Sequence, residues 1–177
     1  MKLGVQALRS APAPKGLNVF SHFHKLYKKM SSHHQIYYHI VFGTKHHKAT
    51  IPDEHCEELY KYIWGIIKNK RCKLYRINGS REHLHLLSDL HPSIALADFV
   101  RDIKTSSSVW LKQNAQFNKF SGWAEGYAAF TITHSDRNRI IEYIKNQKEH
   151  HKKEFFPEEY VRLLKEHEII FDEKYLD

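Results

Sequence analysis

The chain has 177 residues, enough for one domain with a real hydrophobic core. No stretch approaches the roughly 18 to 20 consecutive apolar residues that a membrane-spanning helix needs, so the sequence predicts a soluble protein. Cys56 and Cys72 are too few for a disulfide framework or a thiolate metal site, and they fit a reducing cytoplasm.

Charge is distributed unevenly along the chain, whose formal net charge is +8. Residues 154–177 contain eight acidic and three basic residues and carry −5, so residues 1–153 carry +13. A basic body favours a polyanionic partner such as nucleic acid. The alternative is that its lysines only keep the surface soluble, and charge alone does not separate the two readings.

The first 29 residues show no clear hydrophobic period and contain the turn-rich run Ala11-Pro12-Ala13-Pro14-Lys15-Gly16. We interpret residues 1–29 as an extension, either disordered or not native, with Met30 as the natural start. A basic targeting peptide is the other interpretation, but the segment has neither an apolar core nor a small-residue cleavage site.

The first half of the remaining chain predicts three strands and one helix. Residues 36–42 are rich in β-branched and aromatic side chains, which is typical of a strand. Residues 52–70 have acids early and lysines late, as expected of a helix. Residues 73–78 and 83–90 then form two strands around the turn at Gly79, which predicts an antiparallel hairpin.

The second half predicts three helices and one strand. Ser93 can cap a helix that runs to about Gln113, and residues 127–133 form the fourth strand. Ser135 or Asp136 can cap a third helix that runs to about His150. A short acidic helix at 158–166 and a tail at 169–177 follow.

The resulting order of strand, helix, strand, strand, helix and strand is that of the ferredoxin-like fold, an α+β class. An antiparallel sheet with two helices on one face leaves its other face free. A third helix could meet the sheet there or at its edge.

His83-Leu84-His85 is the most informative stretch of the sequence. Strand side chains alternate, so Leu84 and Leu86 should enter the core while His83 and His85 stand together on the opposite surface. Such a pair is half of a metal site. Because the chain contains 15 histidines, a chance pair is the alternative.

The third predicted helix carries a polar face. At about 100° per residue, Tyr143, Gln147 and His150 fall within a sector of about 60°, with Arg139 and Asn146 beside them. Taken singly, the tyrosine could be a boundary residue and the other two a solvated surface. Their combination with the histidine pair points to a site.

This combination resembles the single-tyrosine transposases of the HUH nuclease superfamily, a group of small insertion-sequence transposases with REP-associated relatives. HUH denotes histidine, hydrophobic residue, histidine, as in Glu82-His83-Leu84-His85. The likeness covers most of the chain from Met30. It is carried also by Tyr38-His39-Ile40-Val41-Phe42, Trp123-Ala124-Glu125-Gly126-Tyr127, the run from Tyr143 to His151, and the ending from Phe156 to Leu176.

The resemblance implies that residues 30–153 form the catalytic domain and residues 154–177 an acidic helix and tail. It implies a divalent metal held by His83, His85 and Gln147, with Tyr143 as the nucleophile. It further implies a homodimer whose composite sites pair the histidines of one subunit with the tyrosine helix of the other. The substrate would be single-stranded DNA, folded as a hairpin at the ends of a mobile element.

The sequence does not decide which residue is the third metal ligand or which metal is bound. His150 or His151 could replace Gln147. Imidazole with an amide carbonyl accepts Mg²⁺ or Mn²⁺ and does not exclude zinc. The resemblance implies Mg²⁺, with Mn²⁺ as the alternative.

A tyrosine nucleophile fits strand joining because it stays attached to the DNA and can be displaced later. Its unperturbed pKa is about 10, so attack at neutral pH needs help from a cation. Candidate phosphate contacts are Lys45, Arg101, Lys104 and Arg139, each of which could equally be a solvated surface residue.

The leading hypothesis is therefore a transposase that cleaves and rejoins single-stranded DNA through a 5′-phosphotyrosine. A domesticated or inactive nucleic-acid-binding module of the same fold is the main alternative. A replication or relaxase-type HUH nuclease is a third hypothesis, but such chains are usually longer and often carry a second tyrosine beside the first.

Overall fold

The computed structural model describes residues 34–172 and 174. The chain divides into two units, Met1–His34 and Gln35–Asp177, and the fold below is that of the second. The extension predicted at 1–29 lies outside the described residues. Within the described part, no helix is both long enough and apolar enough to cross a membrane.

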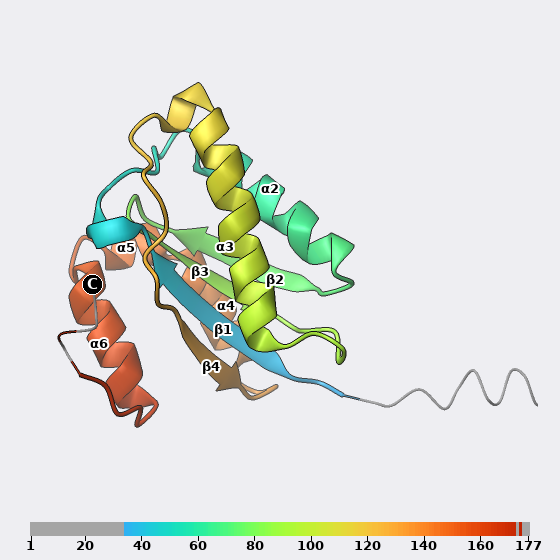
Figure 1. Ribbon diagram of the computed structural model, residues 1–177. Coiled ribbons are helices and arrows are strands. Elements are labelled where there is room, and N and C mark those ends of the chain that lie inside the picture. Colours follow the sequence, from blue (N-terminus) through green and yellow to red (C-terminus); the bar gives the residue numbers. More distant parts are fainter. Residues whose placement is uncertain (1–33, 173, 175–177) are drawn as a thin grey trace, which may run out of the picture. The chain divides into compact units, whose positions relative to one another are not determined.

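The second unit is built on an antiparallel sheet of four strands, β1 (Tyr37–Gly43), β2 (Leu74–Gly79), β3 (His83–Ser88) and β4 (Ala128–Ile132) (Figure 1). Their order across the sheet is β2-β3-β1-β4. All three neighbouring pairs are antiparallel, including the β2–β3 hairpin. The predicted ferredoxin-like arrangement and the hairpin are confirmed.

One face of the sheet is covered by α2 (Cys56–Asn69) and α3 (Leu96–Gln113) (Figure 1). Alternation along the strands sends Ile40, Phe42, Leu84 and Leu86 toward these helices. They form the largest core of the protein with buried helix residues that include Leu59, Ile63, Phe99 and Ile103.

The opposite face is also covered, by α4 (Arg137–Lys145) and α6 (Phe156–Glu166). Ile140 and Ile144 of α4 pack with Tyr37 and Leu87. A separate cluster joins α6 to β1 and β4 through Phe156, Leu163, Leu164, Val41, Ala128 and Phe130. The third predicted helix therefore meets the sheet as expected, but the C-terminal helix seals this face as well.

Two predicted helix starts are wrong. Pro52 lies in a turn whose carbonyl accepts the backbone N–H of His55 at 3.1 Å, and α2 begins only at Cys56. Ser93 does not cap α3, which begins after Ala95. Its hydroxyl instead bonds His91 Nδ1 at 2.7 Å, a local partner that competes with capping.

The third predicted helix is interrupted. It begins after Asp136, as expected, but α4 ends at Lys145 and a short α5 (Gln147–His150) follows. Asn146 lies between them with φ −94° and ψ 16°. Asn78 of β2 donates its amide to the Lys145 carbonyl at 2.8 Å, which satisfies a backbone group freed by the break.

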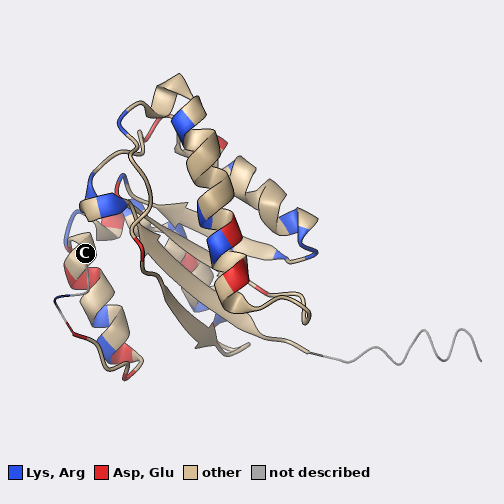
Figure 2. Cartoon of the chain, in the orientation of Figure 1, with Lys and Arg blue, Asp and Glu red and all other residues tan. Residues whose placement is uncertain are grey.

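The C-terminal helix is less acidic than its surroundings in the sequence. Figure 2 shows acidic and basic residues together on α6. Arg162 of this helix pairs with Glu166 at 2.9 Å, and with Glu154, which precedes the helix, at 2.9 Å. The predicted boundary at residues 153 and 154 stays a prediction, although α6 packs on the same sheet as the preceding helices.

Candidate active site

The two histidines of β3 lie as the strand period predicts. His83 and His85 are opposite Gly43 and Val41 of β1, and both point away from the core that holds Leu84. Their ring centroids are 4.8 Å apart. Both side chains are fully buried on this face of the sheet, which the helices α4 and α6 cover.

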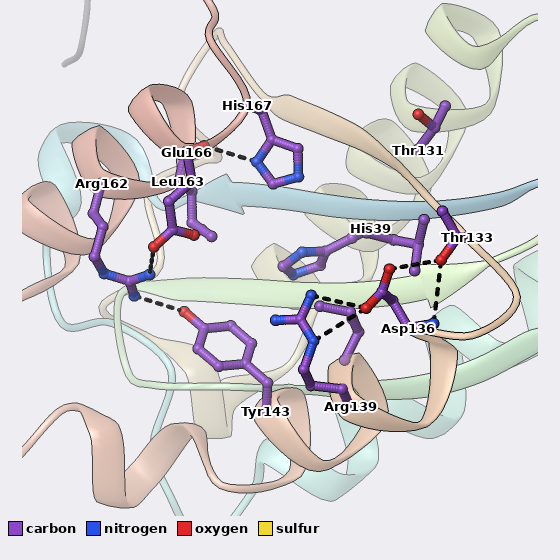
Figure 3. A pocket seen from close by; sticks show the side chains of 12 residues that line it. His39, Thr131, Thr133, Asp136, Arg139, Tyr143, Arg162, Leu163, Glu166 and His167 are labelled. Atoms are coloured by element: carbon purple, nitrogen blue, oxygen red, sulfur yellow. Dashed lines mark hydrogen bonds and ion pairs between the residues drawn. The ribbon is translucent and has the colours of Figure 1, made fainter.

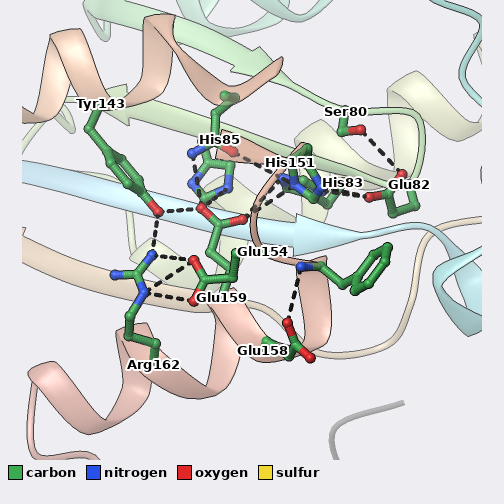
Figure 4. A network of polar contacts seen from close by, with 12 residues as sticks. Ser80, Glu82, His83, His85, Tyr143, His151, Glu154, Glu158, Glu159 and Arg162 are labelled. Atoms are coloured by element: carbon green, nitrogen blue, oxygen red, sulfur yellow. Dashed lines mark hydrogen bonds and ion pairs between the residues drawn. The ribbon is translucent and has the colours of Figure 1, made fainter. Parts of the chain in front are cut away.

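The structure brings Tyr143 of α4 to the histidine pair. Its ring lies edge-on to His85, with 5.9 Å between centroids. Its hydroxyl donates a hydrogen bond to Glu159 and accepts one from Arg162 Nη2 at 3.1 Å (Figure 4). Both partners belong to α6, so the C-terminal helix positions the phenol.

Two of the three candidate third ligands reach His83. Gln147, at the start of α5, is fully buried and places Oε1 3.4 Å from His83 Nε2. His151, just after α5, places Nε2 3.2 Å from the same nitrogen. His150 is exposed and packs on Tyr143 instead, with ring centroids 5.0 Å apart. The break at Asn146 thus leaves Gln147 facing inward.

Glu159 of α6 is the functional candidate that the sequence reasoning missed. The side chain is buried, with Oε1 3.5 Å from His85 Nε2 and Oε2 3.7 Å from His83 Nε2. Gln147 Nε2 donates to Oε1 at 3.0 Å. The available signal was its position, three residues after Phe156 and four before Leu163 on the apolar face of the helix.

His39 was also missed. Tyr37, His39 and Val41 share the second face of β1 by strand alternation. His39 is buried, and its Nε2 is hydrogen bonded to His85 Nδ1 at 3.0 Å. This contact holds the His85 ring with its other nitrogen, Nε2, toward Glu159, as an outer partner of a metal-binding histidine does.

Burial sets the protonation states in the cluster. It lowers the pKa of His85 to about 4 and lowers that of His39 well below its usual value. Burial alone would raise the pKa of Glu159, but close contacts with His151 and His85 outweigh it and hold that pKa far below the usual range. Burial and the Glu159 carboxylate raise the pKa of Tyr143. At neutral pH, His85 and His39 are therefore neutral, Glu159 is ionised and the Tyr143 phenol is protonated.

These residues fit a divalent metal. Ligand atoms of His83, His85 and Glu159 all lie within 4.8 Å of one another, and those of Glu82, His83 and His151 form a second such group. Among the described residues, His85 Nε2 and Glu159 Oε2 are buried polar atoms without a hydrogen-bond partner. Such atoms are rare in proteins unless something else binds them.

The four predicted phosphate contacts lie in different places. Lys45 and Lys104 line one open groove of about 500 Å³ beside α3, although Lys104 Nζ donates to the Glu125 and Gly126 carbonyls at 2.8 and 3.0 Å. Arg101 is exposed on α3 and paired with Asp98 at 2.6 Å.

Arg139 lines a cavity of about 240 Å³ with Tyr143, His39 and Arg162 (Figure 3). It is paired there with Asp136 at 3.2 Å. Arg139 thus shares a cavity with the predicted nucleophile.

The fold and this constellation define a class of protein. Residues 32–147, well over half of the chain, match the family described as "Transposase IS200 like". The chain belongs to this family, which confirms the predicted resemblance. The function of the protein is that of a transposase. The matched range includes His83, His85, Tyr143 and Gln147, and it ends before Glu159.

Individual relatives agree. The transposase for insertion sequence element IS200 of Salmonella typhimurium is 25% identical over 120 residues, which are 65% of this chain and 78% of the relative. The ISDra2 transposase TnpA of Deinococcus radiodurans is 25% identical over 119 residues, 64% and 85% of the two chains. A solved REP-associated tyrosine transposase bound to a REP hairpin shares the fold, with a TM-score of 0.51 and 14% identity over 69% of this chain and 74% of that one.

Proposed function

We propose that this transposase cleaves and rejoins single-stranded DNA with Tyr143 as the nucleophile. The observation that carries the proposal is the position of the Tyr143 ring, which lies edge-on to the buried His85, with 5.9 Å between ring centroids, and so beside the His83 and His85 pair. The phenol oxygen would attack the scissile phosphorus as its proton leaves. The bond from phosphorus to the 3′ oxygen breaks, which gives a 5′-phosphotyrosine and a free 3′-hydroxyl. Attack by another 3′-hydroxyl then releases Tyr143.

His83, His85 and Gln147 would hold a divalent metal, Mg²⁺ by preference and Mn²⁺ as the alternative. The metal supplies positive charge that stabilises the phosphate oxygens as charge builds on them. Arg162 donates to the Tyr143 hydroxyl, so it favours the phenolate and opposes the effect of burial and Glu159 on the Tyr143 pKa. His39 would keep the His85 ring oriented.

The substrate we propose is a DNA hairpin at the ends of a mobile element. The REP-associated transposase that shares this fold is bound to a REP hairpin, and the basic body of the chain favours a polyanion. Lys45 and Lys104, in one groove, and Arg139, beside Tyr143, are the proposed phosphate contacts, with Arg101 on the outer surface of α3.

A labelled hairpin incubated with the protein and Mg²⁺ tests the assignment. Wild-type protein should form a covalent adduct that survives denaturing electrophoresis, and Tyr143→Phe should form none. Tyr160→Phe, a change to another half-buried tyrosine, serves as the matched control and should retain the adduct. An adduct of normal yield with Tyr143→Phe would refute the nucleophile.

An inactive binding module of the same fold remains the second candidate. It is favoured by the complete burial of His83, His85 and Gln147, which leaves no surface of these side chains for a phosphate to reach. Hairpin binding that chelators do not change, with no cleavage under Mg²⁺ or Mn²⁺, would support it over the enzyme.

The predicted homodimer with composite sites also stays a prediction. In the structure, the histidines and Tyr143 of a single chain already lie together. Mixing His83→Ala protein with Tyr143→Phe protein distinguishes the arrangements, because activity returns only if one subunit supplies the metal site and the other the tyrosine.

A further inference from the structure

The carboxylate of Glu159 is an unusual group to find buried on the apolar face of a helix. Its side chain is buried among His83, His85 and His151, and its two oxygens have different surroundings. Oε1 accepts hydrogen bonds from the Tyr143 hydroxyl and the Gln147 amide. Oε2 has no hydrogen-bond partner among the described residues and faces His83 and His151.

The histidine side of the cluster shows the same pattern. His85 Nε2 is buried without a hydrogen-bond partner in the described part of the chain, 3.5 Å from Glu159 Oε1. His85 Nδ1 is already engaged by His39. An imidazole nitrogen without a hydrogen-bond partner thus faces one oxygen of a carboxylate whose other oxygen also has none among the described residues. Burying both atoms without a partner is costly unless something else binds them.

The spacing suits a shared cation. Metal bonds to imidazole nitrogen and carboxylate oxygen are about 2.0 to 2.2 Å long, which puts neighbouring ligand atoms about 3.0 to 3.5 Å apart. Glu159 Oε1 lies 3.5 Å from His85 Nε2, and Oε2 lies 3.7 Å from His83 Nε2 and 3.4 Å from His151 Nε2. These distances exceed a good hydrogen bond and need only a small contraction to bind one ion.

We propose that Glu159 is a carboxylate ligand of the divalent metal and joins His83, His85 and Gln147 in the centre. This inference rests on the metal dependence of the proposed function and extends it beyond the matched family range, which ends at residue 147. Gln147 then orients the carboxylate through its amide N–H in addition to facing His83. An anionic oxygen also makes the site more suitable for Mg²⁺ and Mn²⁺ than two imidazoles and an amide.

A mechanical consequence follows from where Glu159 lies. It belongs to α6, whereas His83 and His85 belong to β3, so one ion would join the C-terminal helix to the sheet. Metal binding should therefore protect α6 from local opening. Helix α2, on the opposite face, has no such link and serves as an internal reference.

Mn²⁺ binding by the full chain, without DNA, tests the proposal. The electron paramagnetic resonance signal of free Mn²⁺ gives the affinity directly. Glu159→Gln keeps the shape and hydrogen-bond acceptor but removes the charge, and it should weaken binding at least tenfold. Glu149→Gln, an exposed residue paired with Lys152, is the matched control and should stay within about twofold of wild type.

The outcomes separate this proposal from the proposed function. If Glu159→Gln binds Mn²⁺ as wild type does while His85→Ala does not, Glu159 is not a ligand and the metal site on the histidines stands. If the wild-type chain binds no Mn²⁺, both fail. Should Glu159→Gln not fold, hydrogen exchange of wild-type protein decides: Mn²⁺ should slow exchange in α6 at least fivefold more than in α2, and equal effects would overturn the proposal.

Discussion

Replacing Arg162 should slow covalent attack by Tyr143 without preventing it. Arg162 Nη2 donates to the Tyr143 hydroxyl at 3.1 Å and favours its ionised form. Burial and Glu159 act in the opposite direction and raise the pKa of Tyr143. Arg162→Met keeps much of the aliphatic stem and removes only the cation, so the pKa of the phenol should rise further.

The size of the effect follows from the contact. A hydrogen bond to a charged group contributes about 1.5 to 3 kcal/mol, and the Arg162 side chain is 37% exposed, which favours the lower end. A loss of about 1.5 kcal/mol from the transition state corresponds to a roughly tenfold slower reaction. Because the rate rises with pH as the phenol ionises, the pH at which the variant reaches a given rate should be about one unit higher.

Single-turnover adduct formation on a labelled hairpin, measured from pH 6 to 10, is the assay. Arg162 also pairs with Glu154, so a loss of helix stability must be separated from a loss of catalysis. Glu154→Gln disturbs that pair without touching Tyr143, and its adduct rate should stay within about threefold of wild type. An Arg162→Met protein with the wild-type rate and pH profile would refute the reasoning.

Four further outcomes are expected. Chelation of divalent ions should abolish adduct formation but leave hairpin binding, measured by mobility shift, nearly unchanged. Lys45→Ala should weaken binding to all single-stranded sequences and lower the salt slope by about one, and an unchanged slope would remove Lys45 from the DNA interface. Leu84→Ala should lower the free energy of unfolding, measured with urea, by about 2 to 5 kcal/mol, because Leu84 is fully buried in the main core. The metal-free protein should lose stability as the pH falls from about 6.5 toward 4. In this range His85 binds a proton in the unfolded chain but not in the folded protein, where burial lowers its pKa to about 4. His85→Asn should make the loss of stability smaller.

Periodicity predicted the parts of this protein that depend on local geometry. The two-residue period of β3 placed His83 and His85 on one face and Leu84 on the other, as the structure has them. The helical period likewise grouped Tyr143 with Gln147, and both side chains reach the cluster. The histidine pair depends only on the strand repeat, whereas Tyr143 and Gln147 reach the same cluster although the helix is interrupted between them at Asn146.

Features that depend on partners distant in sequence were not predicted. The helix break at Asn146 requires Asn78 of β2 to accommodate the Lys145 carbonyl, and nothing in the sequence around residue 146 specifies that partner. Ser93 had the right type for a cap, but His91 bonds its hydroxyl instead. In both cases a hydrogen bond to another residue determined where the helix begins or breaks, and residue propensities alone did not.

Glu159 could have been identified as a site residue from the sequence by the same arguments from periodicity and burial. An ionised carboxylate on the apolar face of a helix is costly to bury unless a cation or a set of donors meets it. Two histidines on the free face of a predicted sheet pose the complementary problem, because polar groups that helices cover need partners of opposite character. Each observation is ambiguous alone. Together they indicate a pairing, because the buried acid of the helix and the two imidazoles of the sheet can serve as polar partners for each other. The cluster around His83 is therefore a reason for α6 to dock where it does, as well as a result of that docking.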